Sequence, residues 1–532
     1  MTLSLRIFLS MWLAAVSFAA EAARPNIVVI LADDMGFSDI GCYGGEIETP
    51  NIDRLAKEGL RFTQFYNTSR CCPTRASLLT GLYPHQAGIG HMTDDYAIPV
   101  RAKLGGPGYE EKLNNRCVTI AEVLGASGYE TFMSGKWHVG NAREAWPDRR
   151  GFSRSFCVVS GAMNYYGSGI QHAAGPLAMQ LQLDGELWNP PTEEFFSTDA
   201  FTDRAVQFVR ERKDSSRPFF LYLAYNAPHW PLHALPEDIA KYRGKYREGF
   251  EKVRATRLQR QISSGLFSAG TPLPPLDEAS PVWDGISEAQ RDEWDLRMAI
   301  YAAQVDAMDR GVGRVLETLR NAGADENTLV LFLSDNGACH ERIDRGQAGA
   351  LLGERDSYSS YRRPWAQVSN TPFRFYKHWT HEGGICTPLI ARWPAVVKRA
   401  GGYARDAGHV IDIMATAVDA AGAGYPAKIS DRAIAPMEGT SLLAALKGEP
   451  LIRTPPLFWE HEGNRAVRDG KWKLVSAFPA GWELYDLEAD RTETRNLADQ
   501  NPEKVQELTA KYDQWAERCF VRPWELTKAG EK

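Results

Sequence analysis

The sequence lacks a long hydrophobic run beyond its first residues, and it carries no strong excess of either charge. No later stretch approaches the ~20 consecutive apolar residues that a membrane-spanning helix needs, so we expect no membrane partner. The formal net charge of -6 over 532 residues gives no indication of nucleic-acid binding, which requires concentrated positive charge. Cysteine is also scarce: the chain has eight, and their wide spacing forms neither a dense disulfide framework nor a zinc motif.

The first 22 residues are typical of a secretory signal peptide. Arg6 gives the positive start, residues 7–20 form a short apolar run, and Ala20-Glu21-Ala22 matches an A-x-A cleavage site. The apolar run is shorter than the ~20 residues that span a bilayer, which disfavours the alternative of a membrane anchor. We therefore expect an exported protein, either periplasmic or secreted.

Three apolar segments, over residues 26–31, 219–224 and 329–333, each precede a group of polar residues. Continuous rather than alternating apolarity is typical of buried strands. A one-sided apolar pattern predicts a long helix over residues 295–320. Strands that alternate with helices predict an α/β fold with a large, mostly parallel or mixed central sheet flanked by helices.

The pattern changes near residue 425. Segments 455–461, 464–468, 471–475 and 482–487 are typical of short strands, with Asp469-Gly470 as a hairpin turn, and residues 502–519 are typical of a helix. We therefore expect a signal peptide over 1–22, a main domain over 23–425 and a smaller C-terminal antiparallel α+β domain over 426–532. Residues 236–292 are charged and punctuated by prolines, which predicts an insertion covering part of a cleft.

Polar side chains follow each of the three predicted strands. Asp33 and Asp34 follow the first, His229 the second, and Asp335 and Asn336 the third. Ligands of α/β sheets bind beyond the carboxyl ends of the strands, so these residues predict one active site. Three carboxylates and an amide oxygen suit a hard divalent cation, calcium better than magnesium because several protein oxygens are offered. A lone Asp-Asp pair is usually a solvated turn, but two such turns at strand ends favour a metal.

The most specific motif is Cys71-Cys72-Pro73-Thr74-Arg75, which continues through Leu79-Thr80-Gly81. Pro73 suits the first turn of a helix. Residue 71 would then lie at a positive helix end, where an anionic ester and a developing oxyanion are stabilised. Arg75 would be a fixed cation beside it. The alternative is a buried structural pair of Cys71 and Cys72.

A lysine and a histidine lie close together in Gly135-Lys136-Trp137-His138-Val139-Gly140. In an extended backbone, Lys136 and His138 point the same way. Together they can hold an anion and move a proton. Alone, this pattern is more often a strand edge with solvated charges.

In family order, these motifs resemble those of the type I, formylglycine-dependent sulfatases of the alkaline phosphatase superfamily. Residues 71–81 match C-x-P-[ST]-R-x-x-x-L-T-G at every fixed position, residues 135–140 match G-K-W-H-[LV]-G, and residues 227–229 match A-P-H. Lys377 lies five residues before Glu382, as in K-x-x-x-x-E-G-G. The resemblance covers nearly all of the mature chain. One departure is Cys386, where many relatives carry arginine.

The resemblance implies an arylsulfatase-like or sugar-sulfatase hydrolysis of sulfate monoesters. A formylglycine-generating enzyme would convert Cys71 to formylglycine, and the substrate would be a sulfated small molecule or carbohydrate. A calcium ion would lie on four residues, with the residue 71 oxygen completing its shell. The implied metal ligands are Asp33, Asp34, Cys71, Asp335 and Asn336.

The resemblance also implies a role for each catalytic side chain. Asp335 would take the proton of the attacking hydroxyl, and Arg75, Lys136 and Lys377 would neutralise charge. His229 would assist the leaving alcohol, and His138 would take the last proton that frees sulfate. His233, four residues after His229, has no firm family role and is predicted to line the pocket.

Two other functions compete with this interpretation. A phosphatase or phosphodiesterase of the same superfamily would carry Ser or Thr as nucleophile and more histidines for two zinc ions. The 11 histidines of the chain and its Asp/Asn turns disfavour that function. A non-catalytic protein that binds sulfated glycans would usually lack the nucleophile or the metal residues, and every one of them is present.

Overall fold

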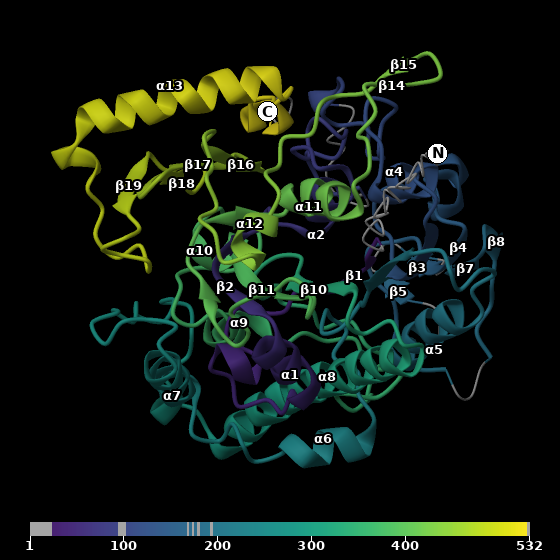
Figure 1. Cartoon of the computed structure of the whole chain (residues 1–532). Helices are drawn as coiled ribbons and strands as arrows, with labels where there is room; N and C mark the ends of the chain where they lie inside the picture. The colour runs from purple at the N-terminus through teal and green to yellow at the C-terminus, as the bar shows by residue number, and fades with distance from the viewer. Residues whose placement is uncertain are drawn as a thin grey trace, which may run out of the picture.

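A mixed sheet of eleven strands forms the centre of the computed structural model (Figure 1). The structure describes residues 24–93, 103–167, 170–172, 175–177, 181–191 and 195–528. The predicted signal peptide, residues 1–22, lies outside the described residues. Within the described ranges, no helix has both the length and the apolar character needed to cross a membrane.

The strands run in the order β12-β2-β11-β10-β1-β9-β3-β4-β7-β8, with β13 paired to β2. The five central strands β10, β1, β9, β3 and β4 are parallel, and β11, β2 and β7 extend the sheet in antiparallel pairings. Their bounds are β1 Asn26–Ala32, β2 Leu60–Tyr66, β3 Glu130–Lys136, β4 Arg154–Val158, β7 Leu181–Leu183, β8 Glu186–Leu187, β9 Phe219–Ala224, β10 Thr328–Ser334, β11 Cys386–Arg392, β12 Tyr403–Ala404 and β13 Gly408–His409.

The three predicted core strands are confirmed as β1, β9 and β10. Alternate residues of β1 point to opposite faces of the sheet, and both faces are covered: Val28 and Ile30 belong to one hydrophobic core, Ile27 and Val29 to the other. This double burial is the physical reason for their continuous apolarity. The predicted α/β fold class is confirmed.

Helices form a layer on each face of the sheet (Figure 1). One layer holds α1 (Pro50–Glu58), α5 (Ser197–Arg210) and α8 (Glu288–Asn321). The other holds α2 (Cys71–Thr80), α4 (Ile120–Ala126), α11 (Asp412–Ala421) and α12 (Leu443–Leu446).

The long helix α8 was predicted to begin at residue 295, and it begins at Glu288. A capping box explains the earlier start, because the Ser287 hydroxyl accepts from the Gln290 backbone N–H while the Gln290 side chain accepts from the Ser287 N–H.

A separate four-stranded antiparallel sheet near the C-terminus confirms the predicted second fold unit. It comprises β16 (Leu457–His461), β17 (Asn464–Asp469), β18 (Trp472–Ser476) and β19 (Glu483–Asp486), and α13 (Pro502–Arg518) packs on it. The division between residues 425 and 426 stays a prediction. Beyond it, Leu442 and Leu446 still pack in the core of the central sheet.

The predicted insertion over residues 236–292 contributes α6 (Pro236–Tyr242) and α7 (Phe250–Ser263), which pack against α8 and α9 (Arg362–Ser369). The remaining short elements are α10 Glu382–Ile385, β5 Ile170–His172, β6 Gly175–Leu177, β14 Lys428–Ile429, β15 Arg432–Ala433 and 3-10 helices at Gly41–Tyr43, Arg143–Ala145, Pro147–Arg149, Trp283–Gly285, Ala498–Gln500 and Trp524–Lys528.

Candidate active site

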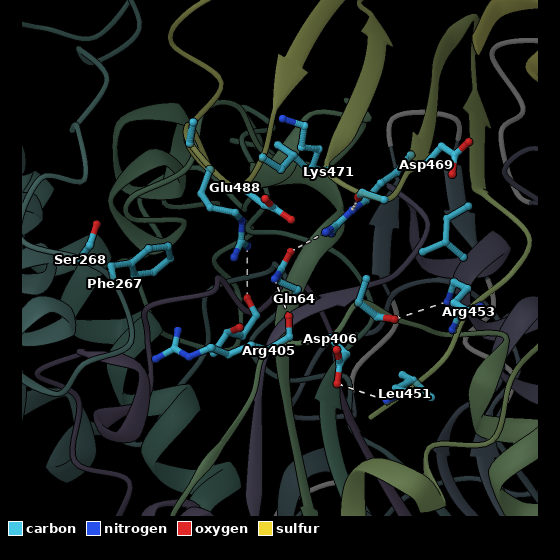
Figure 2. A pocket seen from close by; sticks show the side chains of 18 of the residues that line it. Gln64, Phe267, Ser268, Arg405, Asp406, Leu451, Arg453, Asp469, Lys471 and Glu488 are labelled. Atoms are coloured by element: carbon cyan, nitrogen blue, oxygen red, sulfur yellow. Dashed lines mark hydrogen bonds between the residues drawn. The ribbon is translucent and has the colours of Figure 1, made fainter. Parts of the chain in front are cut away.

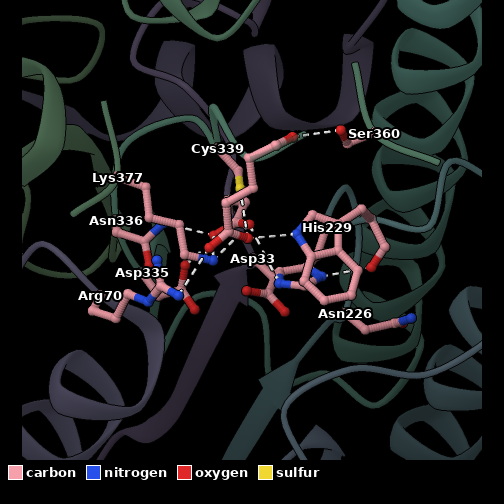
Figure 3. A network of polar contacts seen from close by, with 12 residues as sticks. Asp33, Arg70, Asn226, His229, Asp335, Asn336, Cys339, Ser360 and Lys377 are labelled. Carbon is pink, nitrogen blue, oxygen red and sulfur yellow. Dashed lines mark hydrogen bonds and ion pairs between the residues drawn. The ribbon is translucent and has the colours of Figure 1, made fainter. Parts of the chain in front are cut away.

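The carboxyl ends of β1 and β10 bring two distant pairs of polar residues together (Figure 3). The last residues of the two strands, Ala32 and Ser334, are register partners, so the residues that follow them meet. The Asp34 backbone N–H donates to Asp335 Oδ1 at 3.1 Å. The side-chain amide of Asn336 donates to Asp34 Oδ1 at 2.7 Å.

The turn after β1 holds Asp34 in an unusual backbone conformation. Its φ is 64°, a left-handed value that few residues other than glycine adopt and that aspartate tolerates better than most. Gly36, two residues on, lies so close to the C-terminal end of α9 that a Cβ would sit 2.4 Å from the Ser369 carbonyl oxygen. The turn after the Asp-Asp pair therefore depends on close backbone packing.

Two buried oxygens in this cluster have no hydrogen-bond partner among the described residues: Asp33 Oδ1 and Asn336 Oδ1. The amide nitrogen of Asn336 is occupied by Asp34 and by the Gly337 carbonyl, so its oxygen is turned to the other side. A buried oxygen without a donor is costly. Carboxylate and amide oxygens of this kind suit a hard cation such as calcium, so the donor set fits the predicted metal.

Cys71 is the first residue of α2 and is buried, as the motif predicted. The Cys72 side chain lowers the pKa of the Cys71 thiol well below its usual range, and the charges of Lys136, His138 and Lys377 act in the same direction. All eight cysteines lie in described parts of the chain, and no disulfide forms among them. The structure therefore disfavours a Cys71–Cys72 pair.

Arg75 lies one turn along α2 and is buried. Its guanidinium donates to Asp335 Oδ2 at 2.7 Å and to the Lys136 carbonyl at 2.9 Å. It therefore ties α2 to the ends of β10 and β3, and it places a fixed positive charge inside the site. The guanidinium also lies 3.6 Å from Asp33 Oδ1.

Each carboxylate of the Asp-Asp pair faces its own buried lysine. Lys136 Nζ lies 2.6 Å from Asp33 Oδ2, and Lys377 Nζ lies 2.9 Å from Asp34 Oδ1. Burial raises the pKa of Asp33 despite its lysine. Burial acts the same way on Asp34, but Lys377 and His229 outweigh it and lower the pKa of Asp34. Burial, followed by the Asp33 charge, raises the pKa of Asp335 to about 7.

The expectation of an extended backbone through His138 is wrong. Strand β3 ends at Lys136, and His138 has a φ of 54°. Its buried ring packs over Gly161, where a Cβ would lie 2.5 Å from the imidazole. His138 still lies close enough to Cys71 for its charge to act on the thiol.

His229 follows β9 and faces Asp34 in the turn after β1. Its Nδ1 lies 2.6 Å from the Trp230 carbonyl, so Nδ1 carries the hydrogen and donates it. The lone pair of Nε2 then faces Asp34 Oδ2 at 3.4 Å. Burial lowers the pKa of His229 to about 4, so two acceptors face each other at neutral pH, and a proton or cation fits between them. His233, which was predicted to line the pocket, instead contacts the Ser357 carbonyl at 2.7 Å. It is therefore not a member of this network.

The sequence did not single out Arg70 and Glu341, which adjoin the site. Arg70 precedes Cys71 and pairs with Glu341 at 2.9 Å. Trp230, next to His229, donates to the other oxygen of Glu341 at 2.8 Å. The position of Arg70 next to the motif was the only signal available, because Glu341 belongs to a distant loop.

A group of histidines beside this network was also missed. His91 Nδ1 lies 3.5 Å and His461 Nε2 lies 3.3 Å from Glu462 Oε1. His378, the residue after Lys377, places its Nδ1 3.3 Å from Glu462 Oε2. Burial lowers the pKa of His91 to about 3, so its imidazole is neutral at neutral pH. No spacing rule joins His91 to a hairpin of the C-terminal sheet.

A larger surface pocket lies elsewhere, between the central sheet and the C-terminal sheet (Figure 2). Gln64, Phe267, Arg405 and Lys471 are among its lining residues, and no predicted site residue is. Three more of its cations are held by protein partners: Arg453 by Asp412, Arg468 by Gln64 and Arg491 by Glu382. Size alone therefore does not make it the active site.

The structure brings the predicted catalytic and metal residues into one buried network. Its members are Asp33, Asp34, Cys71, Arg75, Lys136, His138, His229, Asp335, Asn336 and Lys377. A site with a thiol-bearing residue at a helix N-terminus, fixed cations and two imidazoles can bind an anionic ester and transfer protons.

Comparison with known proteins finds similarity to sulfatases over most of the chain. A family model described as Sulfatase matches residues 25–423, and one described as N-sulphoglucosamine sulphohydrolase, C-terminal, matches residues 373–518. An uncharacterized sulfatase from Schizosaccharomyces pombe is 35% identical over 515 residues, 92% of this chain and 93% of that protein. An arylsulfatase from Klebsiella aerogenes is 34% identical over 450 residues, 82% of this chain and 95% of that protein. The crystal structure of Ps i-CgsB in complex with k-i-k-neocarrahexaose aligns with a TM-score of 0.69 and 26% identity, over 95% of this chain and 98% of that chain.

Proposed function

The chain belongs to the sulfatase family and hydrolyses sulfate esters, and we propose that it does so through a formylglycine formed from Cys71 beside a calcium ion. One observation supports this most directly. Cys71 begins α2 in a buried setting whose lysines, Lys136 and Lys377, are paired to the two metal-turn aspartates. The nucleophile position, the anion-binding charges and the metal ligands thus share one network.

The calcium ion would be held by Asp33, Asp34, Asp335 and Asn336, and it would supply positive charge against the sulfuryl oxygens. This assignment is supported by the two buried oxygens of Asp33 and Asn336 that lack donors in the described chain. The hydrated aldehyde at residue 71 supplies two hydroxyl groups, one to displace the alcohol at sulfur and one whose deprotonation releases sulfate.

We assign proton transfer to three side chains. Asp335 accepts the proton of the attacking hydroxyl. His229, aided by Lys377, stabilises the leaving alcohol oxygen, or protonates it once Nε2 has taken up a proton, and His138 takes the proton that frees sulfate. Lys136 and Arg75 hold the anionic oxygens, the kind of fixed electrostatic support that usually contributes most to catalysis.

The substrate class is proposed as a sulfated carbohydrate, with small aryl sulfates as assay substrates. The carbohydrate assignment is supported by the match of residues 373–518 to a family named for a sulfated amino sugar. Activity on aryl sulfates is supported by the likeness to an arylsulfatase over 82% of the chain. We further propose export after removal of residues 1–22, maturation by a formylglycine-generating enzyme, and a catalytic domain over 23–425 followed by a C-terminal domain over 426–532.

Peptide mass spectrometry of residue 71 tests the proposal, with protein produced alongside a formylglycine-generating enzyme. We expect the Cys71 peptide to lose its sulfur and to carry an aldehyde or its hydrate, and turnover of an aryl sulfate to rise with the converted fraction. An intact thiol in fully active protein would contradict the mechanism. Faster turnover of the matching aryl phosphate would instead favour a phosphatase.

A further inference from the structure

Three histidines and a glutamate form a second cluster, beside the catalytic network but not part of it. They come from three separate segments: His91 lies in the loop after α2, His378 follows Lys377, and His461 and Glu462 form the tip of the β16–β17 hairpin. One ligand atom from each of His91, His461 and Glu462 lies within 4.8 Å of the others. From this arrangement we propose a second metal site that binds zinc through these three residues.

The distances fit a tetrahedral ion. Ligand atoms at 2.0–2.1 Å from zinc are separated by about 3.3 Å from one another in tetrahedral geometry. His91 Nδ1 lies 3.5 Å and His461 Nε2 lies 3.3 Å from the same oxygen of Glu462. Two imidazole nitrogens and one carboxylate oxygen form a ligand set that zinc favours and calcium does not.

The two histidines are poorly explained without a ligand. Both are more than nine-tenths buried, at 4% exposure for His91 and 1% for His461. One ring nitrogen of each faces Glu462 Oε1 at ion-pair distance, but none of the four ring nitrogens makes a hydrogen bond of good geometry within the part of the chain that the structure describes. Buried polar atoms are nearly always satisfied, so these nitrogens point to a missing partner.

His378 supports the site as an orienting residue. The Asn464 side-chain oxygen accepts from the Phe478 backbone N–H, so its nitrogen faces His378 Nε2 at 3.2 Å and donates to it. His378 therefore carries its hydrogen on Nδ1, which lies 3.3 Å from Glu462 Oε2. A histidine that donates to the free oxygen of a metal-bound carboxylate fixes the orientation of that ligand.

The backbone of Glu462 carries an independent signal. Its φ is 52°, and the following Gly463 has a φ of 80°, the conformation of a two-residue hairpin turn that strongly prefers Asn or Gly at the first position. Glutamate is disfavoured in this left-handed conformation because its Cβ crowds the backbone. Its carboxylate offsets that cost if it binds a metal between the hairpin and the loop that carries His91.

The site would join the C-terminal sheet to the catalytic domain next to the nucleophile. Cys72, the neighbour of Cys71, donates its thiol to the His91 carbonyl at 3.6 Å, and His378 is the neighbour of Lys377. A zinc ion here would hold both catalytic segments against the β16–β17 hairpin. This inference does not depend on the chemistry proposed for Cys71.

Cobalt binding to the full-length protein tests the site. Protein stripped of metal and then saturated with calcium is titrated with Co²⁺, which gives visible absorption bands in a four-coordinate site. We expect one equivalent to bind with such bands, and Glu462→Gln and His461→Ala to abolish them. Loss of an orienting residue typically weakens metal binding roughly 10- to 100-fold, so His378→Ala should fall in that range.

Two variants serve as matched controls. His340→Gln removes a partly buried histidine outside the cluster and should keep the bands, and Cys71→Ala should keep them although it removes the nucleophile. Glu462→Gln changes one atom of the side chain, so its effect is readable even if His461→Ala fails to fold. Absence of cobalt bands in the calcium-saturated wild type would overturn the proposal, as would bands that persist in Glu462→Gln.

Discussion

Two buried groups of charged side chains lie at the same edge of the central sheet, and they differ in how completely they are paired. In the interface cluster around Glu382 and Glu493, every carboxylate oxygen lies within 3.3 Å of a donor, and Glu493 Oε1 is held by the Lys473 ion pair rather than by a hydrogen bond. In the catalytic network, the Arg75 guanidinium lies farther from Asp33 Oδ1, at 3.6 Å, and Asn336 Oδ1 has no hydrogen-bond partner among the described residues.

The difference separates a structural cluster from a functional one. Buried charges that are fully paired hold two parts of a chain in register, and the interface cluster joins α10 to β18 of the C-terminal sheet. Buried oxygens that stay unpaired cost stability and persist where a ligand completes them. Substitutions in the catalytic network should therefore reduce activity more than the free energy of unfolding. Substitutions in the interface cluster should reduce the free energy of unfolding more than activity.

The largest effect is expected for the nucleophile. Cys71→Ala should lower kcat by at least about 10⁴-fold, equivalent to about 5.4 kcal/mol of transition-state stabilisation, because no other group replaces the attacking oxygen. The free energy of unfolding should change little, since only one sulfur atom is lost. Initial rates with an aryl sulfate and urea unfolding measure the two quantities. Cys72→Ala is the matched control and should stay active; inactivity of that variant together with an active Cys71→Ala would refute the assignment.

The next effect is expected at the interface cluster. Lys473 pairs with Glu382 at 2.9 Å and with Glu493 at 2.8 Å, and all three side chains are buried. Lys473→Met should lower the free energy of unfolding by about 3–5 kcal/mol, because it removes the cation that faces Glu382 Oε1 and Glu493 Oε1 in a buried site. The folded fraction should keep its kcat.

Lys471→Met is the control for this prediction. Lys471 pairs with Asp486 on the surface, where its side chain is 42% exposed, so its loss should lower the free energy of unfolding far less than the loss of Lys473 does. Urea unfolding of both variants gives the comparison. Equal losses would mean that burial does not distinguish the interface cluster from a surface pair.

Calcium should stabilise the catalytic network and leave the interface cluster unaffected. At a calcium concentration 100 times Kd, binding adds about 2.7 kcal/mol to the free energy of unfolding, and a chelator should remove that increment. Asp34→Asn should abolish the calcium dependence, whereas Glu382→Gln should retain it. A calcium-dependent Asp34→Asn protein would show that the ion binds elsewhere.

Much of the catalytic network was predictable because its residues follow strands that can be recognised locally. Asp33, Asp34, Asp335 and Asn336 follow unbroken apolar segments, and the register of β1 with β10 then brings them together. The conformation of His138 was not predictable, because a left-handed φ at histidine leaves no pattern in the surrounding sequence.

The interface cluster could not be found from the sequence. Glu382 and Lys473 are separated by 91 residues, and they meet only because the C-terminal sheet packs in one particular position against the central-sheet part of the chain. Sequence periodicity predicts that sheet but not where it docks. For the same reason, the sequence did not indicate that His461 and Glu462 lie near the site.

The smallest effect is expected for the contact between His381, which precedes α10, and Glu483 of the C-terminal sheet. Glu483 on β19 lies 2.9 Å from His381 Nε2 and accepts from the Tyr485 hydroxyl at 2.8 Å. Burial raises the pKa of Glu483, but His381, Tyr485 and Arg374 outweigh it and lower the pKa to about 2. A carboxyl whose pKa is lower in the folded state stabilises the folded protein at pH values above its unfolded pKa, here 4.5. That contribution to the free energy of unfolding is lost as the pH falls towards 2.

Glu483→Gln should therefore cost about 1–2 kcal/mol of unfolding free energy at pH 6, after a reduction for solvent screening of this partly exposed group. The difference in unfolding free energy between wild type and Glu483→Gln should decrease as the pH falls from 4.5 towards 3. Urea unfolding at pH 6, 4.5 and 3 measures it. If this difference in unfolding free energy stays constant with pH, Glu483 titrates alike in the folded and unfolded chains. The interface cluster, rather than the Glu483–His381 pair, would then provide the electrostatic stabilisation that holds the C-terminal sheet in place.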